Sequence, residues 1–181
     1  MKKFIKITDE ILEEENFKSY LVDEVRTNFT IETSECELGM MYAITDCESP
    51  IEQLLAIELE RINLKNIYEL NPFIDVIEIE KQKEIKCGKK TYRVDFLIPV
   101  VYKNQENKMF VVECDGHEFH QKTKEQVEND NKRQRDLQKE GYEIIRFSGT
   151  EIWHKSYQCA CEIKNIIMSK CKYVKGGQDD R

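Results

Sequence analysis

Hydrophobic and polar positions alternate along this chain in a pattern that predicts both helices and strands. Apolar residues at helical spacing predict an amphipathic helix over 8–25, whereas 28–47 sustains neither a helical nor a strand period. Ser49, Pro50 and Glu52 match the N-cap, first-turn proline and third position of a capping box, so a helix is expected to begin there. Further strands are expected over 73–79, 92–98, 109–115 and 142–147, and further helices over 124–140 and after a second capping box at 148–151.

The connections refine this picture. The polar stretch 103–108 predicts a hairpin between the second and third strands, and 81–90 is either a turn region or a further short strand. Pro99 cannot donate a ladder hydrogen bond, so it indicates a bulge, an edge or an early strand end. The order of elements predicts an α/β fold with a mixed sheet flanked by helices.

Length and composition favour one folded domain. The chain has 181 residues, 40% of them hydrophobic, which is enough for one core. No apolar run approaches the ~20 residues that span a bilayer, so we expect a soluble, cytoplasmic protein without a membrane partner, and we interpret the seven cysteines as reduced thiols. The expected divisions are an acidic helical extension at 1–46, the folded domain at 47–173 and a flexible tail at 174–181.

Charge is distributed unevenly. The first 60 residues carry a net charge of −10, and the remainder carries +3. A polyanion is repelled by the first block and weakly attracted by the second, so a nucleic acid is expected to approach the C-terminal two thirds. The acidic total argues against tight, nonspecific DNA binding.

Two carboxylates stand on strands whose neighbours favour burial. A hairpin folded near Gln105 places Asp95 roughly opposite residues 113–116, so that Asp95 and Glu113 become neighbours, with Asp115 on the same face as Glu113. Like charges this close repel unless something positive lies between them, and a divalent cation is the simplest candidate. The alternative for Asp95 is a buried salt bridge to Arg93 or Arg146.

Several segments in a fixed order carry a resemblance. They are SPIE at 49–52, Gln82 followed by YRVDF at 92–96, VECDGHEFH at 112–120, and the stretch from ND at 129–130 to GYEIIRF at 141–147. In this order and spacing the chain resembles the PD-(D/E)XK nuclease superfamily, and most of all its very-short-patch-repair endonuclease-like branch. The resemblance covers about 49–153, and it implies a three-layer, restriction-endonuclease-like α/β core with metal-dependent phosphodiesterase activity.

The resemblance also implies roles for individual residues. Asp95 would be the central metal ligand, Glu113 would take the second acidic position, and the carbonyl group of Cys114 would complete the metal site. Glu52 would lie over the metal through a water molecule, and Asp130 would correspond to the last acid of the family.

One departure from the superfamily concerns the general base. Many members have Glu-X-Lys where this chain has Glu113, Cys114 and Asp115, so the usual lysine is absent. In the repair-endonuclease branch a histidine serves this part of the site, which makes His120 the candidate general base and His117 its substitute.

Simpler explanations exist for the same residues. Glu52 also fits the capping box, and the two roles are compatible. Asp115 and the glycine after it fit a turn at a strand end, and both histidines fit a surface loop. Cys114, His117 and His120 make a poor zinc site because no fourth ligand is evident.

The polar helix expected over 124–140 carries a run of basic residues. Lys132, Arg133 and Arg135 are candidate phosphate contacts because this helix directly follows the suspected site. A charge run of this kind is also typical of a solvated helix face, here balanced by acids on the same helix.

The sequence therefore predicts a DNA endonuclease that uses Mg²⁺, with Mn²⁺ able to substitute. Two other classes remain open: a nucleic-acid-binding module that has lost catalysis, and a regulatory component in which the acidic N-terminal block docks a protein partner. A homodimer is compatible with the same sequence.

Overall fold

The computed structural model describes residues 42–103, 105–116 and 123–172. The predicted helix over 8–25 and the tail after 173 lie outside these ranges. The elements in chain order are α4 (Pro50–Arg61), the 3-10 helix η2 (Leu64–Glu69), β1 (Ile74–Val76), β2 (Glu80–Cys87), β3 (Lys90–Tyr102), β4 (Lys108–Asp115), α5 (Lys124–Lys139), β5 (Tyr142–Ser148) and α6 (Gly149–Ser169).

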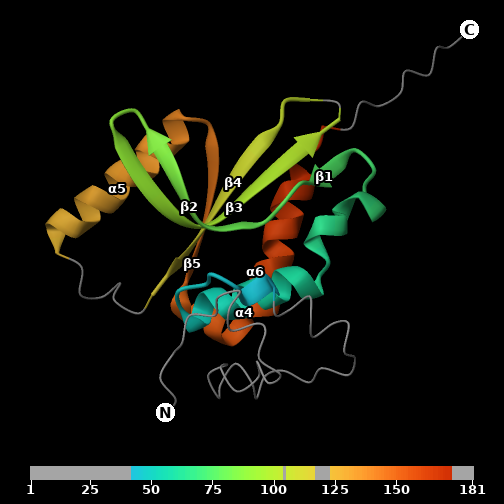
Figure 1. Ribbon diagram of the computed structural model, residues 1–181, viewed down its shortest axis with the longest axis horizontal. Coiled ribbons are helices and arrows are strands. Elements are labelled where there is room, and N and C mark those ends of the chain that lie inside the picture. The colour runs from blue at the N-terminus through green and yellow to red at the C-terminus, as the bar shows by residue number, and fades with distance from the viewer. Residues whose placement is uncertain (1–41, 104, 117–122, 173–181) are drawn as a thin grey trace, which may run out of the picture.

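These strands form one mixed sheet. The order is β1-β3-β4-β5, and β2 also pairs with β3 (Figure 1). The pairs of β3 with β1, β2 and β4 are antiparallel, whereas β4 and β5 run parallel because α5 connects them as a crossover. The predicted α/β fold with a mixed sheet flanked by helices is confirmed, and it is consistent with a restriction-endonuclease-like core.

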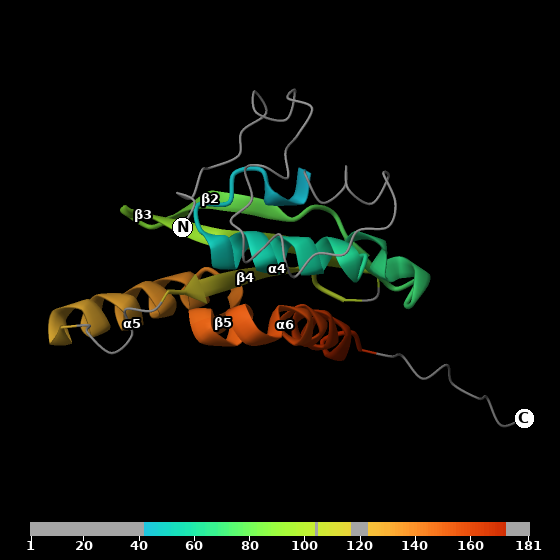
Figure 2. The same cartoon turned by 90° about the horizontal axis from the view of Figure 1, so that it is seen from below.

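Helices cover both faces of the sheet (Figure 2). Helices α4 and α6 pack together over one face and enclose the larger core, which includes Leu55, Phe96 and Ile163. Helix α5 covers the other face through Leu137, which joins Val94 and Val111 in a smaller core. The larger core begins as early as Ile44, which is fully buried although it lies in the range expected for the extension.

The local signals in the sequence form the expected structures. Ser49 and Ser148 cap α4 and α6 through their side chains, and Thr123 caps α5 in the same way. Gly141 follows α5 with φ of 89°, a left-handed conformation that favours glycine.

Pro99 interrupts neither β3 nor the sheet. The pairing of β3 with β2 ends at Leu97, and its pairing with β1 begins at Val100, so Pro99 lies between the two partners. Its carbonyl group accepts a hydrogen bond from the N–H group of Ile77 at 3.2 Å, and the nitrogen faces the same gap. Because proline has no N–H group, the reciprocal bond to the carbonyl group of Ile77 is not made, and Pro99 lies just beyond the last paired position of β1.

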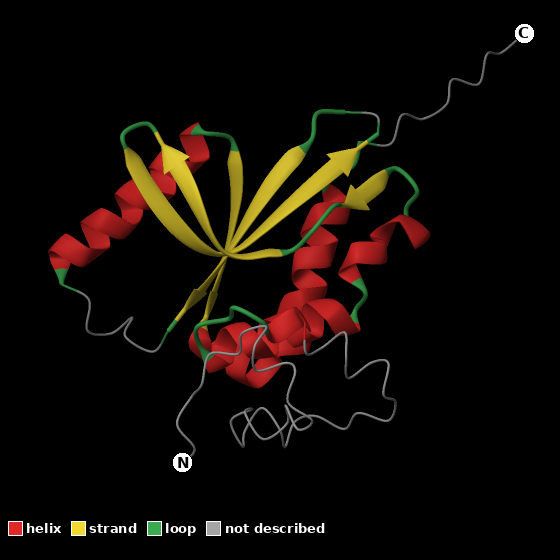
Figure 3. Ribbon diagram, in the orientation of Figure 1, coloured by secondary structure: helices red, strands yellow, loops and turns green. Residues whose placement is uncertain are grey.

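Strands β3 and β4 separate partway along their length. Their pairing runs from Val100 opposite Lys108 to Phe96 opposite Val112. Beyond that point β3 pairs with β2, and β4 continues alongside β5 to Asp115. In Figure 3 the β2–β3 hairpin leaves the centre of the view in a different direction from the ends of β4 and β5.

Within the described ranges, no helix combines the length and apolar character needed to cross a lipid bilayer.

Candidate functional site

Asp95 and Glu113 lie at the point where β3 and β4 separate. The last paired positions of the two strands are Phe96 and Val112. Asp95 immediately precedes Phe96 on β3, and Glu113 immediately follows Val112 on β4. The carboxylate of Asp95 bridges the opening, because its Oδ2 accepts a hydrogen bond from the N–H group of Cys114 at 2.6 Å. This bond replaces a ladder bond that the separating strands no longer make, so the predicted proximity of the two acids is confirmed.

Glu113 is held by an arginine from α5. The guanidinium of Arg133 donates two hydrogen bonds to the Glu113 carboxylate, at 2.8 and 3.2 Å, and a third to the carbonyl group of Arg93. The Glu113 side chain is only 7% exposed, and that of Arg133 is 23% exposed. A bidentate pair with this little solvent is strongly oriented.

The next acid on the same face has its own arginine. Arg146 donates to the two oxygens of Asp115 at 3.0 and 3.1 Å. Arg93 instead pairs with Glu48 at 2.6 Å. The two arginines considered as salt-bridge partners of Asp95 are therefore engaged with other acids.

Asp95 differs from Glu113 and Asp115, whose carboxylates each pair with an arginine. Among the residues that the structure describes, it makes no salt bridge, and its Oδ1 accepts no hydrogen bond. The negative charges of Glu52 and Asp115 both act on it, and the positive charge of Arg133 acts in the opposite direction. The arrangement therefore leaves one oxygen of Asp95 available to a ligand.

Glu52 points toward this acid from α4. Its carboxylate accepts hydrogen bonds from the N–H group of Glu48 at 2.7 Å and the hydroxyl group of Ser49 at 2.6 Å. The N-cap bond from the N–H group of Glu52 to Ser49 is present, but the side chain of Glu52 bonds the N–H group before the N-cap residue, so the predicted capping box is only half formed. The Glu52 carboxylate also accepts a hydrogen bond at 2.8 Å from the side-chain amide of Gln82. Glu52 is thus held by three donors and is only 6% exposed.

Gln82 occupies an unusual backbone position. Its φ is 50°, and it falls between the paired positions Lys81 and Lys83 of β2, opposite Asp95 on β3. A left-handed conformation in a residue other than glycine is rare, and such positions gather at functional sites. Here it turns the amide of Gln82 onto Glu52.

The pKa values of the two central acids reflect this environment. Burial raises the pKa of Asp95 to about 6, which the hydrogen bond from Cys114 partly opposes and the charge of Glu52 reinforces. Burial likewise raises the pKa of Glu113 to about 7, with Arg133 acting against the rise and Asp95 adding to it. The site therefore resists carrying both negative charges without a further cation.

This resistance predicts a pH dependence of stability. In the unfolded chain both acids lose their protons near their ordinary pKa values, whereas the folded chain retains them to about pH 6 and 7. Between these limits the folded state binds more protons, so the free energy of unfolding falls as pH rises from about 4 to 7 and then levels off. Urea denaturation in a chelator, compared with Asp95→Asn, measures this: the variant is expected to show a shallower fall, and equal slopes would contradict the assignment.

The basic side chains of α5 point in different directions. Lys132 and Arg135 are exposed beside a shallow surface depression, whereas Arg133 turns inward to Glu113. Asp130, one turn before Arg133, borders a small crevice with Glu113 and Arg146. His117 and His120 lie outside the described residues, so their proposed roles stay predictions.

The acids fit an oxygen-bound divalent cation at Asp95. Carboxylate and carbonyl oxygens are the ligands that Mg²⁺ prefers, and Asp95 has a free oxygen and no salt-bridge partner among the described residues. The described ranges contain no preformed group of three His, Cys, Asp or Glu side chains at metal-binding spacing. Glu113 would join a metal only by sharing or leaving Arg133.

The sequence placed Gln82 among the residues that carry the resemblance but gave it no role, and it did not predict the inward direction of Arg133. A signal for Arg133 was present, because Leu137 is the buried residue of α5 and Arg133 precedes it by four positions, on the same helix face. No comparable local pattern marks the left-handed conformation of Gln82.

A mixed sheet with helices on both faces is consistent with a restriction-endonuclease-like fold. The family model REase_MTES_1575 matches residues 74–167, just over half of the chain, and the protein belongs to this restriction-endonuclease-like family. No curated protein and no solved structure matches it.

Proposed function

We propose that this protein is a metal-dependent endonuclease that hydrolyses phosphodiester bonds in DNA, with Mg²⁺ as cofactor and Mn²⁺ as a substitute. The observation that carries the proposal is Asp95, a partly buried carboxylate with a free oxygen among other acids, at the point where β3 and β4 separate. Membership of a restriction-endonuclease-like family supports the same activity.

The proposal gives each residue of the acidic site a role. The N–H group of Cys114 fixes the orientation of the Asp95 carboxylate, so that its second oxygen faces the ligand. The amide of Gln82 and the helix cap hold Glu52 in place as an acceptor for an ordered water molecule. Glu113 supplies the second carboxylate, and the carbonyl group of Cys114 is the remaining oxygen donor.

A bound divalent cation supplies charge neutralisation at the scissile phosphate and lowers the pKa of an attacking water molecule. His120 is the proposed general base, as the resemblance to the very-short-patch-repair branch implies, with Asp130 in the outer part of the site. Lys132 and Arg135 are the proposed phosphate contacts on α5, where both are exposed.

The second candidate function is a nucleic-acid-binding module without turnover. The bidentate pair of Arg133 with Glu113 favours it, because a guanidinium already neutralises the second acid. This candidate predicts retention of DNA without cleavage under any metal.

Cleavage of supercoiled plasmid tests the proposal. The protein is expected to nick or linearise the plasmid with Mg²⁺ or Mn²⁺, and a chelator is expected to stop it. Binding of the plasmid without cleavage under either metal would favour the inactive module, and activity that persists in the chelator would exclude the metal-dependent mechanism.

A further inference from the structure

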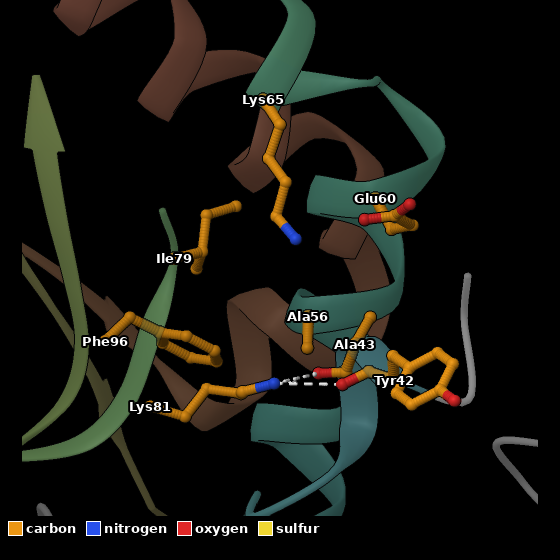
Figure 4. A pocket seen from close by; sticks show the side chains of 8 residues that line it. All are labelled: Tyr42, Ala43, Ala56, Glu60, Lys65, Ile79, Lys81 and Phe96. Carbon is orange, nitrogen blue, oxygen red and sulfur yellow. Dashed lines mark hydrogen bonds between the residues drawn. The ribbon is translucent and has the colours of Figure 1, made fainter. Parts of the chain in front are cut away.

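A second feature lies beside the acidic site. A cavity of about 320 Å³ opens between the helical residues Tyr42 and Ala43, helix α4, the start of η2, and strands β2 and β3 (Figure 4). Its volume is at the lower end of the range for small-molecule sites. It adjoins the acids through the chain, because Phe96 follows Asp95 and Ala56 lies one helical turn after Glu52.

Two lysine ammonium groups face this cavity. The Nζ of Lys81 donates to the carbonyl groups of Tyr42 and Ala43, at 2.9 and 3.3 Å, and an ammonium has a third donor left to offer. Lys65 extends into the open space between Ile79 and the helix, as Figure 4 shows. Within the part of the chain that the structure describes, Lys65 makes no salt bridge or hydrogen bond.

The two positive charges repel each other. Burial lowers the pKa of Lys81, and the ammonium of Lys65 lowers it further, whereas acids nearby act against the shift. Like charges gathered around an open space are relieved by an anion between them. Because both ammonium groups line the open space and have donors left to offer, the lysine side of the cavity can bind an anionic group.

The other lining residues indicate which chemical group is bonded to the anion. Ala56, Ile79 and Phe96 give an apolar wall, whereas the ring of Tyr42 points away from the open space in Figure 4. Glu60 is the acidic group of the lining and can accept a hydrogen bond from an amino group or ring N–H group. A phosphate joined to a planar, hydrogen-bonding base matches these features.

We propose that this cavity binds one nucleotide of the substrate strand, with its phosphate between Lys65 and Lys81 and its base against Ile79. The assignment rests on the proposed nuclease function for the identity of the strand. The cavity would then be a subsite that positions the nucleic acid beside Asp95, and none of the acids Glu52, Asp95 and Glu113 lines it.

Oligonucleotide binding in a chelator tests the subsite without cleavage. Fluorescence anisotropy with a labelled single strand of about 12 nucleotides is measured for Lys65→Gln and Lys81→Gln at several salt concentrations. Each variant is expected to bind about five-fold more weakly and to reduce the salt slope by about 0.7, as loss of one phosphate contact requires. Lys86→Gln, an exposed position on the same strand β2, is the matched control and should change affinity less than about two-fold.

Lys65 is exposed and outside the sheet, so its variant tests the proposal even if Lys81→Gln loosens the helical residues Tyr42 and Ala43. Equal affinities for all three variants, or no measurable binding by the wild type, would overturn the subsite. A titration with deoxyadenosine monophosphate separates the two sources of a nucleotide. Lysine-dependent binding of the mononucleotide without lysine-dependent binding of the strand would assign the cavity to a free nucleotide and overturn the strand proposal.

The two proposals can fail separately. If Asp95→Asn abolishes cleavage while the lysine variants bind normally, the subsite is wrong and the nuclease function stands. If Asp95→Asn still cleaves DNA while the lysine variants lose affinity, the subsite stands and the proposed catalytic role of Asp95 is wrong.

Discussion

Asp95→Asn is expected to reduce plasmid cleavage by at least about 1,000-fold while making the fold more stable. The amide oxygen of asparagine can still accept the hydrogen bond from Cys114, so the separated strands stay bridged. The charge needed to bind a cation is lost. A residue kept for stability alone would show the opposite change in stability.

The gain in stability follows from the raised pKa of Asp95. Holding this acid ionised above pH 7, when its pKa is raised from 3.8 to about 6, costs up to about 3 kcal/mol in the metal-free protein. Urea denaturation in a chelator at about pH 8 should therefore show a higher free energy of unfolding for the variant than for the wild type.

The matched control for this experiment is Asp75→Asn. Asp75 lies on β1 in the same sheet but is exposed, so cleavage and stability are both expected to stay near wild type. A loss of stability in Asp95→Asn would mean that its carboxylate serves mainly to hold β4, and undiminished cleavage would remove it from the catalytic site.

Arg133→Gln is expected to give the largest loss of stability, about 3–5 kcal/mol in the metal-free protein. The substitution leaves the carboxylate of Glu113, which is 7% exposed, without its bidentate partner. Arg135→Gln is the matched control, because Arg135 is exposed on the same helix, and its effect should stay within about 0.5 kcal/mol.

The same variant tests the relation between Arg133 and metal binding. With the guanidinium gone, Glu113 is free to become a ligand, so Mn²⁺ should raise the melting temperature of Arg133→Gln more than that of the wild type. The double variant Glu113→Gln with Arg133→Gln should recover part of the lost stability and keep the measurement possible if the single variant folds poorly. Equal stability of the Arg133 and Arg135 variants would contradict an inward, structural Arg133.

Features set by local sequence were predictable. Ser49 and Ser148 cap helices through neighbours three residues away, and Gly141 ends α5 by its own backbone freedom, so a short stretch contains the whole signal. The proximity of Asp95 to Glu113 was predictable for a related reason, because a hairpin with a short connection fixes its register.

Features that depend on packing between distant segments were not predictable in the same way. The spacing of Arg133 to Leu137 places Arg133 on the face of α5 that packs on the sheet, but only the packing of α5 decides that this arginine reaches Glu113. The cavity likewise combines Lys65 with Lys81, from segments that no periodicity connects. Tertiary packing, which propensity does not encode, determines both.

The central claim is that Asp95 binds a divalent cation, and Mn²⁺ soaked into crystals of the full chain tests it most directly. The account predicts an anomalous scattering peak at about 2.1 Å from Oδ1 of Asp95, the usual distance for such a cation and a carboxylate oxygen. Crystals of Asp95→Asn should lack that peak. Manganese bound only at other carboxylates, with Asp95 making no contact to it, would contradict the account.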